Sequence, residues 1–111
     1  MKIFEVDTIT DEIFKAFQSL IPQLTDSGEI PDREVLDSIV SAESTRLLIA
    51  VDEAKSPERI VGVLTLVIYR IPTGQLARIE DVVVEQDMRR QGVGRLLVDA
   101  ALQQARNAGV K

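Results

Sequence analysis

The chain of 111 residues contains no cysteine, no histidine and no tryptophan, and aromatic residues make up only 4% of it. Without cysteine it can form no disulfide, no thiolate metal site and no cysteine nucleophile. The absence of histidine removes the commonest general base and the commonest metal ligand. Any catalysis must therefore use carboxylates, hydroxyls, the lone Tyr69, backbone groups or a cofactor, and we expect no metal site.

Basic residues are fewer than acidic ones, with 13 Lys and Arg against 18 Asp and Glu and a formal net charge of −5. This balance argues against general binding to nucleic acid or to an anionic membrane surface, and it is compatible with an amine substrate. The N-terminal residues lack the apolar region of a signal peptide, and no apolar run approaches the length of a membrane span. We therefore expect a cytoplasmic protein.

The length and the 45% of hydrophobic residues predict a single domain, residues 1–111, with a core of Ile, Leu and Val. Alternating or continuous apolar residues predict strands over 2–6, 46–51, 60–70 and 76–84. The last three are joined by short loops, which implies an antiparallel meander. Gly62 inside the third strand predicts a bulge or a close backbone approach.

Apolar residues at helical spacing predict three helices. The first begins after a cap at Thr8 or Thr10, the second has Pro31 at its first position, and the third runs from about Gly92 to Ala108. The expected order is strand, helix, helix, three strands, helix.

The chain reaches Lys111 directly after this last helix, where an α/β arrangement would place another strand beside 76–84. We therefore expect a C-terminally shortened chain or one completed by another copy. The exposed edge of strand 76–84 predicts self-association, such as a homodimer.

The most informative stretch runs from Leu76 to Leu97, where a strand leads through a basic loop with two glycines into a helix. The free N–H groups and the positive dipole end of a helix start favour a phosphate-bearing ligand. Because Gly92 and Gly94 lack side chains, a pyrophosphate can approach the backbone of residues 90–95 closely. The alternative is an ordinary helix start with solvated arginines.

Two familiar phosphate loops do not fit this stretch. A dinucleotide-binding GxGxxG motif requires a third glycine where the chain has Leu97, and it belongs to a parallel first βα unit. A Walker loop requires a GK[ST] sequence, which does not follow.

The loop RRQGVG, preceded by IEDVVV and followed by RLLVDAALQQA, resembles the acetyl-CoA loop of the GNAT (GCN5-related N-acetyltransferase) superfamily. Arg89, Gly92 and Gly94 meet the family pattern of Arg or Gln, two residues, Gly, one residue, and Gly or Ala. The resemblance covers the whole chain and implies an α/β (α+β) fold of order β-α-α-β-β-β-α. Its sheet would be mixed, mostly antiparallel and flanked by helices, without the family's C-terminal strands and helix.

The resemblance implies acetyl-CoA as co-substrate. Three valines would pair their backbone with the pantetheine arm, and the arginines would contact phosphate oxygens. The implied cofactor-binding residues are Val82, Val83, Val84, Arg89, Arg90, Gln91, Gly92, Val93, Gly94 and Arg95.

Two adjacent carboxylates, Glu80 and Asp81, precede the valines, and strand alternation predicts that they face opposite sides of the sheet. In the family that the chain resembles, carboxylates here or nearby on this strand act through ordered water to deprotonate the acceptor amine. Alternatively, either one pairs with Arg78 or caps a local network. Tyr69 does not match the family's tyrosine that protonates the leaving thiolate, so we expect it to pack.

The resemblance implies transfer of an acetyl group from acetyl-CoA to a primary amine, of a small molecule or a protein, by direct attack in a ternary complex. The IEDVVV stretch is similar to glucosamine-6-phosphate N-acetyltransferases, but it does not identify the acceptor. We expect the first two helices and the 70–74 turn to wall the acceptor site. A non-catalytic acyl-CoA-binding or regulatory module is the alternative, and a plain interaction domain is a third.

Overall fold

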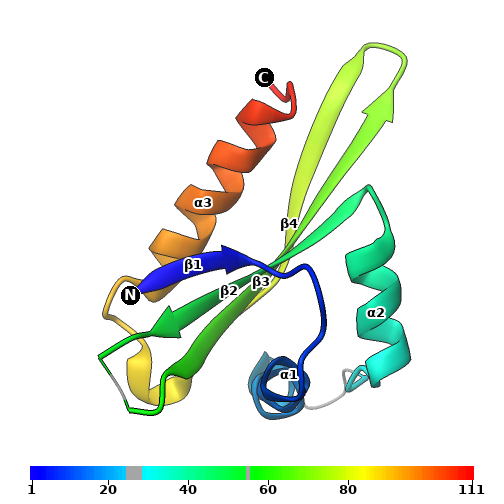
Figure 1. Ribbon diagram of the computed structural model, residues 1–111. Coiled ribbons are helices and arrows are strands. Elements are labelled where there is room, and N and C mark those ends of the chain that lie inside the picture. Colours follow the sequence, from blue (N-terminus) through cyan, green and yellow to red (C-terminus); the bar gives the residue numbers. More distant parts are fainter. Residues whose placement is uncertain (25–28, 55) are drawn as a thin grey trace.

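The computed structural model describes residues 1–24, 29–54 and 56–111, and its elements follow the predicted order (Figure 1). Residues 86–88 form a short 3-10 turn, η1, between the last strand and the last helix. The elements are β1 (Lys2–Glu5), α1 (Asp11–Leu24), α2 (Arg33–Ser41), β2 (Thr45–Asp52), β3 (Arg59–Ile71), β4 (Gly74–Val84) and α3 (Val93–Asn107).

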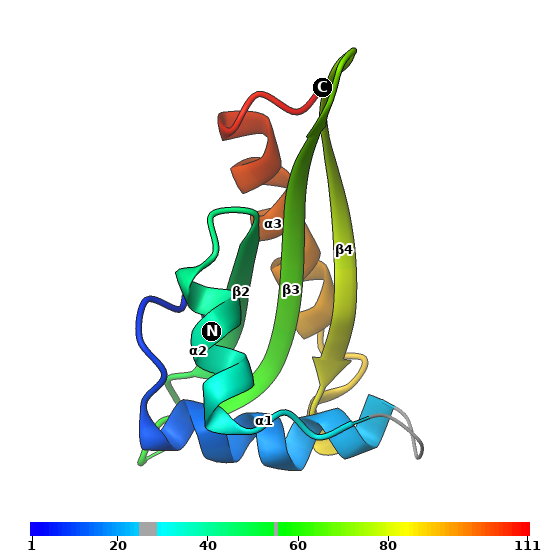
Figure 2. The ribbon, with the colours of Figure 1, turned by 90° about the vertical axis from the view of Figure 1, so that its right-hand side faces the viewer.

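The four strands of the described residues form one sheet in the order β1-β2-β3-β4, and each neighbouring pair is antiparallel. Helix α3 covers one face of the sheet, whereas α1 and α2 lie on the other (Figures 1 and 2). The predicted fold class is therefore confirmed. None of the helices described here is both long and apolar enough to cross a membrane.

The alternation of side chains along β2 divides the core into two layers. Leu47 and Ile49 pack with Phe17 and other residues of α1 and α2. Leu48 packs on the opposite face with Leu97 and other residues of α3. Burial on both faces explains why the central strands are continuous apolar runs, and it matches the predicted core of Ile, Leu and Val.

The helix starts confirm the predicted cap of α1 and correct the predicted first residue of α2. The Oγ1 atom of Thr10 accepts the backbone N–H of Ile13 at 3.2 Å, as a cap of α1. Pro31, however, is not the first residue of α2. Asp32 is the N-cap, and its carboxylate accepts the N–H of Val35 at 2.9 Å. The prediction was wrong because a carboxylate that can satisfy a free N–H group defines the helix start, and Pro31 lies just before it.

Gly62 lies where the register between β2 and β3 shifts, between Ala50 and Val51. A Cβ atom at Gly62 would lie 3.0 Å from Cδ1 of Leu97 and 3.3 Å from the carbonyl oxygen of Val83. The strand irregularity and the close approach that this glycine predicted are both present. The absence of a side chain here lets α3 pack directly against the sheet.

We expect Gly62→Ala to lower the free energy of unfolding by about 1–3 kcal/mol, because the added methyl group overpacks the core against a backbone carbonyl that cannot turn away. Urea denaturation measures the effect. Gly94→Ala is the matched control, since its Cβ would meet only the side chain of Val84, at 3.7 Å. Unfolding of both variants at the same urea concentration as the parent chain would contradict a close contact at Gly62.

Candidate functional site

The loop from β4 to α3 is anchored by two buried side chains. Met88 is 8% exposed and Val93 is 2% exposed, whereas residues 89–92 between them are exposed. Gly92 is the N-cap of α3 and has a left-handed φ of 83°, which favours glycine. The two anchors therefore hold a short exposed loop at the N-terminus of α3.

The N-terminus of α3 has the properties of an anion site. The N–H group of Leu96 makes the first helical bond, to Gly92 at 3.1 Å, so the N–H groups of the three preceding residues lack helical acceptors. A Cβ atom at Gly92 would have no neighbour within 4 Å, and one at Gly94 would meet only Val84. This open space, next to the positive end of the helix dipole, fits a pyrophosphate.

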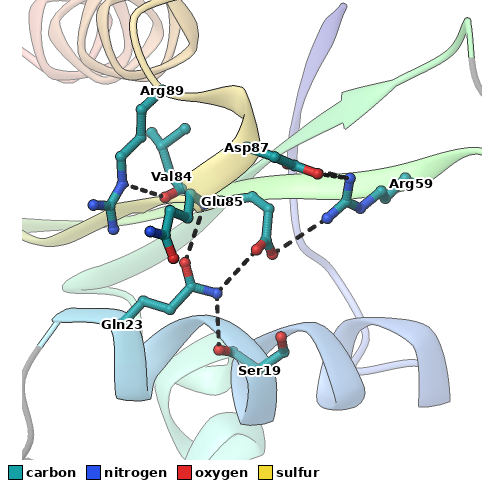
Figure 3. A network of polar contacts seen from close by, with 8 residues as sticks. Ser19, Gln23, Arg59, Val84, Glu85, Asp87 and Arg89 are labelled. Carbon is teal, nitrogen blue, oxygen red and sulfur yellow. Dashed lines mark hydrogen bonds and ion pairs between the residues drawn. The ribbon is translucent and has the colours of Figure 1, made fainter.

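The three arginines of the loop differ in their contacts. Nε of Arg89 donates to the carbonyl oxygen of Val84 at 3.2 Å, which ties the loop to β4 (Figure 3). Arg95 lies 3.9 Å from Asp99, and both side chains are exposed. Arg90 has a left-handed φ of 67°, a conformation that costs a non-glycine residue about 1–2 kcal/mol. Nothing in the sequence pattern predicted that strain.

The side chains of the three valines of β4 pack in the core, and their backbone lies at the edge of the sheet. Val83 is buried beneath α1 and α2, whereas Val82 and Val84 pack towards α3. Strand β4 pairs with β3 and with no other strand of the described residues, so its second edge has no strand partner, although the carbonyl oxygen of Val84 accepts from Arg89. An extended ligand can pair with such an edge. The predicted cofactor-binding residues lie in one stretch from this edge to the start of α3, but the side chains of Val83 and Val93 are buried in the core.

A polar network fixes the start of the loop to α1 (Figure 3). The amide nitrogen of Gln23 donates to Oε1 of Glu85 at 3.1 Å, and its amide oxygen accepts the N–H of Gln86 at 3.1 Å. Arg59 lies 3.6 Å from Glu85 and 3.0 Å from Asp87. The role of Gln23 could not be predicted from the sequence, because its partners lie more than sixty residues away and no local motif marks it.

We expect Gln23→Leu to lower the free energy of unfolding by about 1–2 kcal/mol, since Glu85 and the N–H of Gln86 both lose a hydrogen bond. Urea denaturation again provides the measurement. Gln103→Leu is the control, because its amide donates only to the exposed Asn107, and we expect a change within about 0.5 kcal/mol. Equal effects of the two variants would contradict a structural role for the network.

A bulge in β4 corrects the expected orientation of the two carboxylates. The register between β3 and β4 shifts between Val63 and Thr65, and Asp81 takes a left-handed φ of 51°. Glu80 pairs with Thr65, and Thr65 and Asp81 line the same cavity. Glu80 and Asp81 therefore share the face of α1 and α2, contrary to the prediction. A bulge adds one residue and so interrupts the alternation of side chains.

The two carboxylates have different surroundings. Glu80 forms an ion pair with Arg78 at 3.0 Å, which is the alternative that the sequence left open. Asp81 takes part in none of the ion pairs of the described residues and lines a cavity of about 320 Å³ between α1, α2 and the sheet. Across the described ranges, no three acidic side chains gather closely enough to hold a metal ion.

The cavity that Asp81 lines is walled by the first two helices but not by the 70–74 turn. That turn lies at the opposite end of the sheet from α1 (Figure 2) and borders a separate groove. Tyr69 lines another groove and is four residues from Thr65 along β3, about 13 Å at the usual rise of a strand. Tyr69 is 38% exposed, so the expectation that it packs is wrong for the core.

Polar contacts between α1 and α2 hold the wall of this cavity. Nε2 of Gln18 donates to the carbonyl oxygen of Pro31 at 2.7 Å. Arg33 donates to Asp11 at 2.6 Å and to the carbonyl oxygen of Ile9 at 2.8 Å. The hydrogen bond and the charge of Arg33 lower the pKa of Asp11. That ion pair therefore adds stability above the ordinary pKa of an aspartate, which is lost as the pH falls through the lowered value.

Comparison with known proteins agrees with this geometry. The profile of the acetyltransferase (GNAT) family matches residues 10–111. An aminoglycoside acetyltransferase from an uncultured soil metagenomic sample, solved with sisomicin, superposes with a TM-score of 0.80 and 26% identity, over 99% of this chain and 72% of that one.

Two further structures share the fold at lower identity. Glucosamine-6-phosphate N-acetyltransferase from Arabidopsis thaliana has a TM-score of 0.78 and 21% identity, over 99% of this chain and 78% of that one. An aminoglycoside 6'-N-acetyltransferase from Acinetobacter haemolyticus has a TM-score of 0.77 and 17% identity, over 100% of this chain and 75% of that one. With the family match over nearly its whole length, the chain belongs to the GNAT family of acetyltransferases.

Proposed function

We propose that the chain binds acetyl-CoA and transfers its acetyl group to a primary amine. The observation that carries the proposal is one continuous path across the molecule. It begins at the open N-terminus of α3 near Gly94, follows the free edge of β4, and ends at Asp81 beside the cavity. A long ligand with an anionic end and a reactive end fits such a path.

Each part of the path has a separate role in this proposal. Acetyl-CoA supplies a thioester that an amine nitrogen can attack, which forms an amide and releases the thiol. The N–H groups of residues 93–95 bind the pyrophosphate, with charge from Arg90 and Arg95. The backbone of residues 82–84 holds the pantetheine arm. Asp81 accepts a proton from the ammonium group through water, so that the neutral amine can attack.

The geometry favours Asp81 over Glu80 as the base. Asp81 lines the cavity, whereas the carboxylate of Glu80 is 3.0 Å from the guanidinium of Arg78. The guanidinium of Arg78 occupies a carboxylate oxygen of Glu80 that a bridging water molecule would need. Glu80 remains the second candidate because the pair is exposed to solvent and can open.

A turnover assay tests the proposal. The chain is incubated with acetyl-CoA and a panel of amines that includes sisomicin, glucosamine 6-phosphate, 2-phenylethylamine and a lysine peptide, and the release of free thiol is followed. We expect at least one amine to be acetylated, with the product identified by mass. Binding of acetyl-CoA without acetylation of any amine would contradict the enzyme proposal.

A non-catalytic acyl-CoA-binding module is the second candidate function. The observation that favours it is the position of Tyr69, which lies about 13 Å along β3 from Thr65, the residue that pairs with Glu80. At that distance its phenol is not placed to give the leaving thiolate a proton. If the chain is such a module, we expect tight binding of acetyl-CoA and no turnover, so the same assay separates the two functions.

We also propose that the free edge of β4 mediates self-association. The same edge would pair with the pantetheine arm, so the two uses compete. We expect light scattering to show a concentration-dependent oligomer that dissociates when acetyl-CoA is added. A monomer at every concentration would contradict this proposal.

A further inference from the structure

The cavity next to Asp81 has an apolar wall. It has a volume of about 320 Å³ and lies between α1, α2 and the sheet. Phe17, Leu36 and Leu47 line it and are almost fully buried, with exposed fractions of 3%, 1% and 1%. Its floor therefore offers mainly dispersion contacts, and Thr65 on β3 adds one hydroxyl group. Its volume is near the lower end of the range for small-molecule sites, about 300–1,000 Å³.

The charged groups of the cavity all have the same sign. Three acidic residues from three segments line it, Glu29 before α2, Asp32 at the cap of α2 and Asp81 on β4. The described residues that line it include no lysine and no arginine. Asp32 uses one carboxylate oxygen to accept the N–H of Val35, which leaves the other oxygen for a ligand. The cavity thus combines a neutral apolar interior with negative groups.

The apolar wall and the acidic residues together favour amines according to the charge of their head and the polarity of their body. A cationic head is attracted to the carboxylates, and an apolar body gains free energy when it leaves water for the cavity. A phosphate group would be repelled by three negative charges and would find no cationic side chain among the described residues that line the cavity. The hydroxyl groups of a sugar would lose their hydrogen bonds to water against the apolar wall.

We infer that the acceptor is a small primary amine with a compact apolar body and no anionic group, such as an arylalkyl or alkyl monoamine. The inference rests on the proposed acetyl transfer and specifies its substrate class. It excludes glucosamine 6-phosphate, although the stretch IEDVVV is similar to the enzymes that use that sugar.

Binding can be tested without turnover by titrating isotope-labelled protein with 2-phenylethylamine and following backbone amide signals. We expect saturable shifts at Thr65 and Asp81, on the neighbouring strands β3 and β4, and no saturable shifts there with glucosamine 6-phosphate. Saturable binding of glucosamine 6-phosphate at these residues, or no binding of 2-phenylethylamine, would overturn the inference.

Asp32→Ser tests the role of charge while preserving the fold. Serine retains an N-cap oxygen for α2 but removes the carboxylate. We expect the dissociation constant of 2-phenylethylamine to rise about three- to tenfold, as is typical for the loss of a partly screened ion pair. Asp52→Ser is the matched control, because its carboxylate accepts the N–H of Ala54 in a turn outside the cavity. Equal affinities of the two variants would contradict the inference.

The experiments distinguish a failure of this inference from a failure of the proposed function. Acetylation of another amine class, without binding of 2-phenylethylamine, would overturn the inference and leave the acetyl transfer supported. Binding of 2-phenylethylamine without acetylation of any amine would contradict the transfer and support the cavity as an amine site.

Discussion

Gly94→Glu is expected to weaken acetyl-CoA binding at least about 100-fold, since an opposed like charge costs several kcal/mol and each 1.4 kcal/mol is a factor of ten. The carboxylate would project from the first turn of α3, where the pyrophosphate is proposed to bind. Titration calorimetry of the parent chain and the variant with acetyl-CoA measures the effect.

The same substitution should leave the fold intact, so a loss of affinity for acetyl-CoA can be assigned to the loop. A Cβ atom at Gly94 would meet only Val84, at 3.7 Å, and a carboxylate in the first turn of a helix is stabilising. We therefore expect the melting temperature of Gly94→Glu to be equal to that of the parent chain or higher. Gln103→Glu, which adds the same charge on the exposed side of α3, should bind acetyl-CoA normally. Unchanged affinity in Gly94→Glu would rule out the loop as the pyrophosphate site.

Asp81→Asn is expected to lower kcat about 10²–10⁴-fold, the usual contribution of a general base. Asparagine has nearly the same size and also tolerates the left-handed conformation that Asp81 adopts, so the bulge should persist. The dissociation constant of acetyl-CoA should change little, because the side chain is not part of the pyrophosphate loop. Steady-state kinetics with the best amine of the panel, together with calorimetry, separates these two effects.

Two further variants assign the role within the pair of carboxylates. Glu80→Gln should have a smaller effect on kcat than Asp81→Asn, since Glu80 is paired with Arg78. Asp99→Asn removes a carboxylate on the surface of α3 and should leave kcat unchanged. If Glu80→Gln abolishes turnover and Asp81→Asn does not, the base has been assigned to the wrong residue.

Much of the fold could be predicted from local patterns. The apolar runs of β2 and β3 reflect burial on both faces of the sheet, and the cap at Thr10 depends on residues within one turn. The start of α2 was misplaced by two residues, at Pro31 instead of Arg33, because Pro31 and Asp32 both carry helix-start signals. Only the observed hydrogen bond of Asp32 decides between them.

The bulge in β4 could not be predicted from the stretch IEDVVV. Strict alternation placed Glu80 and Asp81 on opposite faces, but one extra residue brings both to the face of α1 and α2. Such a bulge depends on how β4 packs against β3, a pairing between distant residues. The link from Gln23 to Glu85 is equally non-local, as are the carboxylates that gather around the cavity.

The loop itself was the most predictable part of the site. Its glycines and arginines are adjacent in sequence, and the structure places them at the open N-terminus of α3 as expected. What the sequence did not reveal is how the loop is supported. The buried side chains of Met88 and Val93 anchor its two ends, and Arg89 donates to β4.

The most direct test of the central claim is a calorimetric titration of the chain with acetyl-CoA at low and at high salt. We predict saturable binding with a dissociation constant below about 1 mM, the upper end of usual KM values, that weakens as salt screens the arginines and the helix N-terminus. Absence of saturable binding, or binding that Gly94→Glu leaves unchanged, would contradict the claim that this loop holds acetyl-CoA.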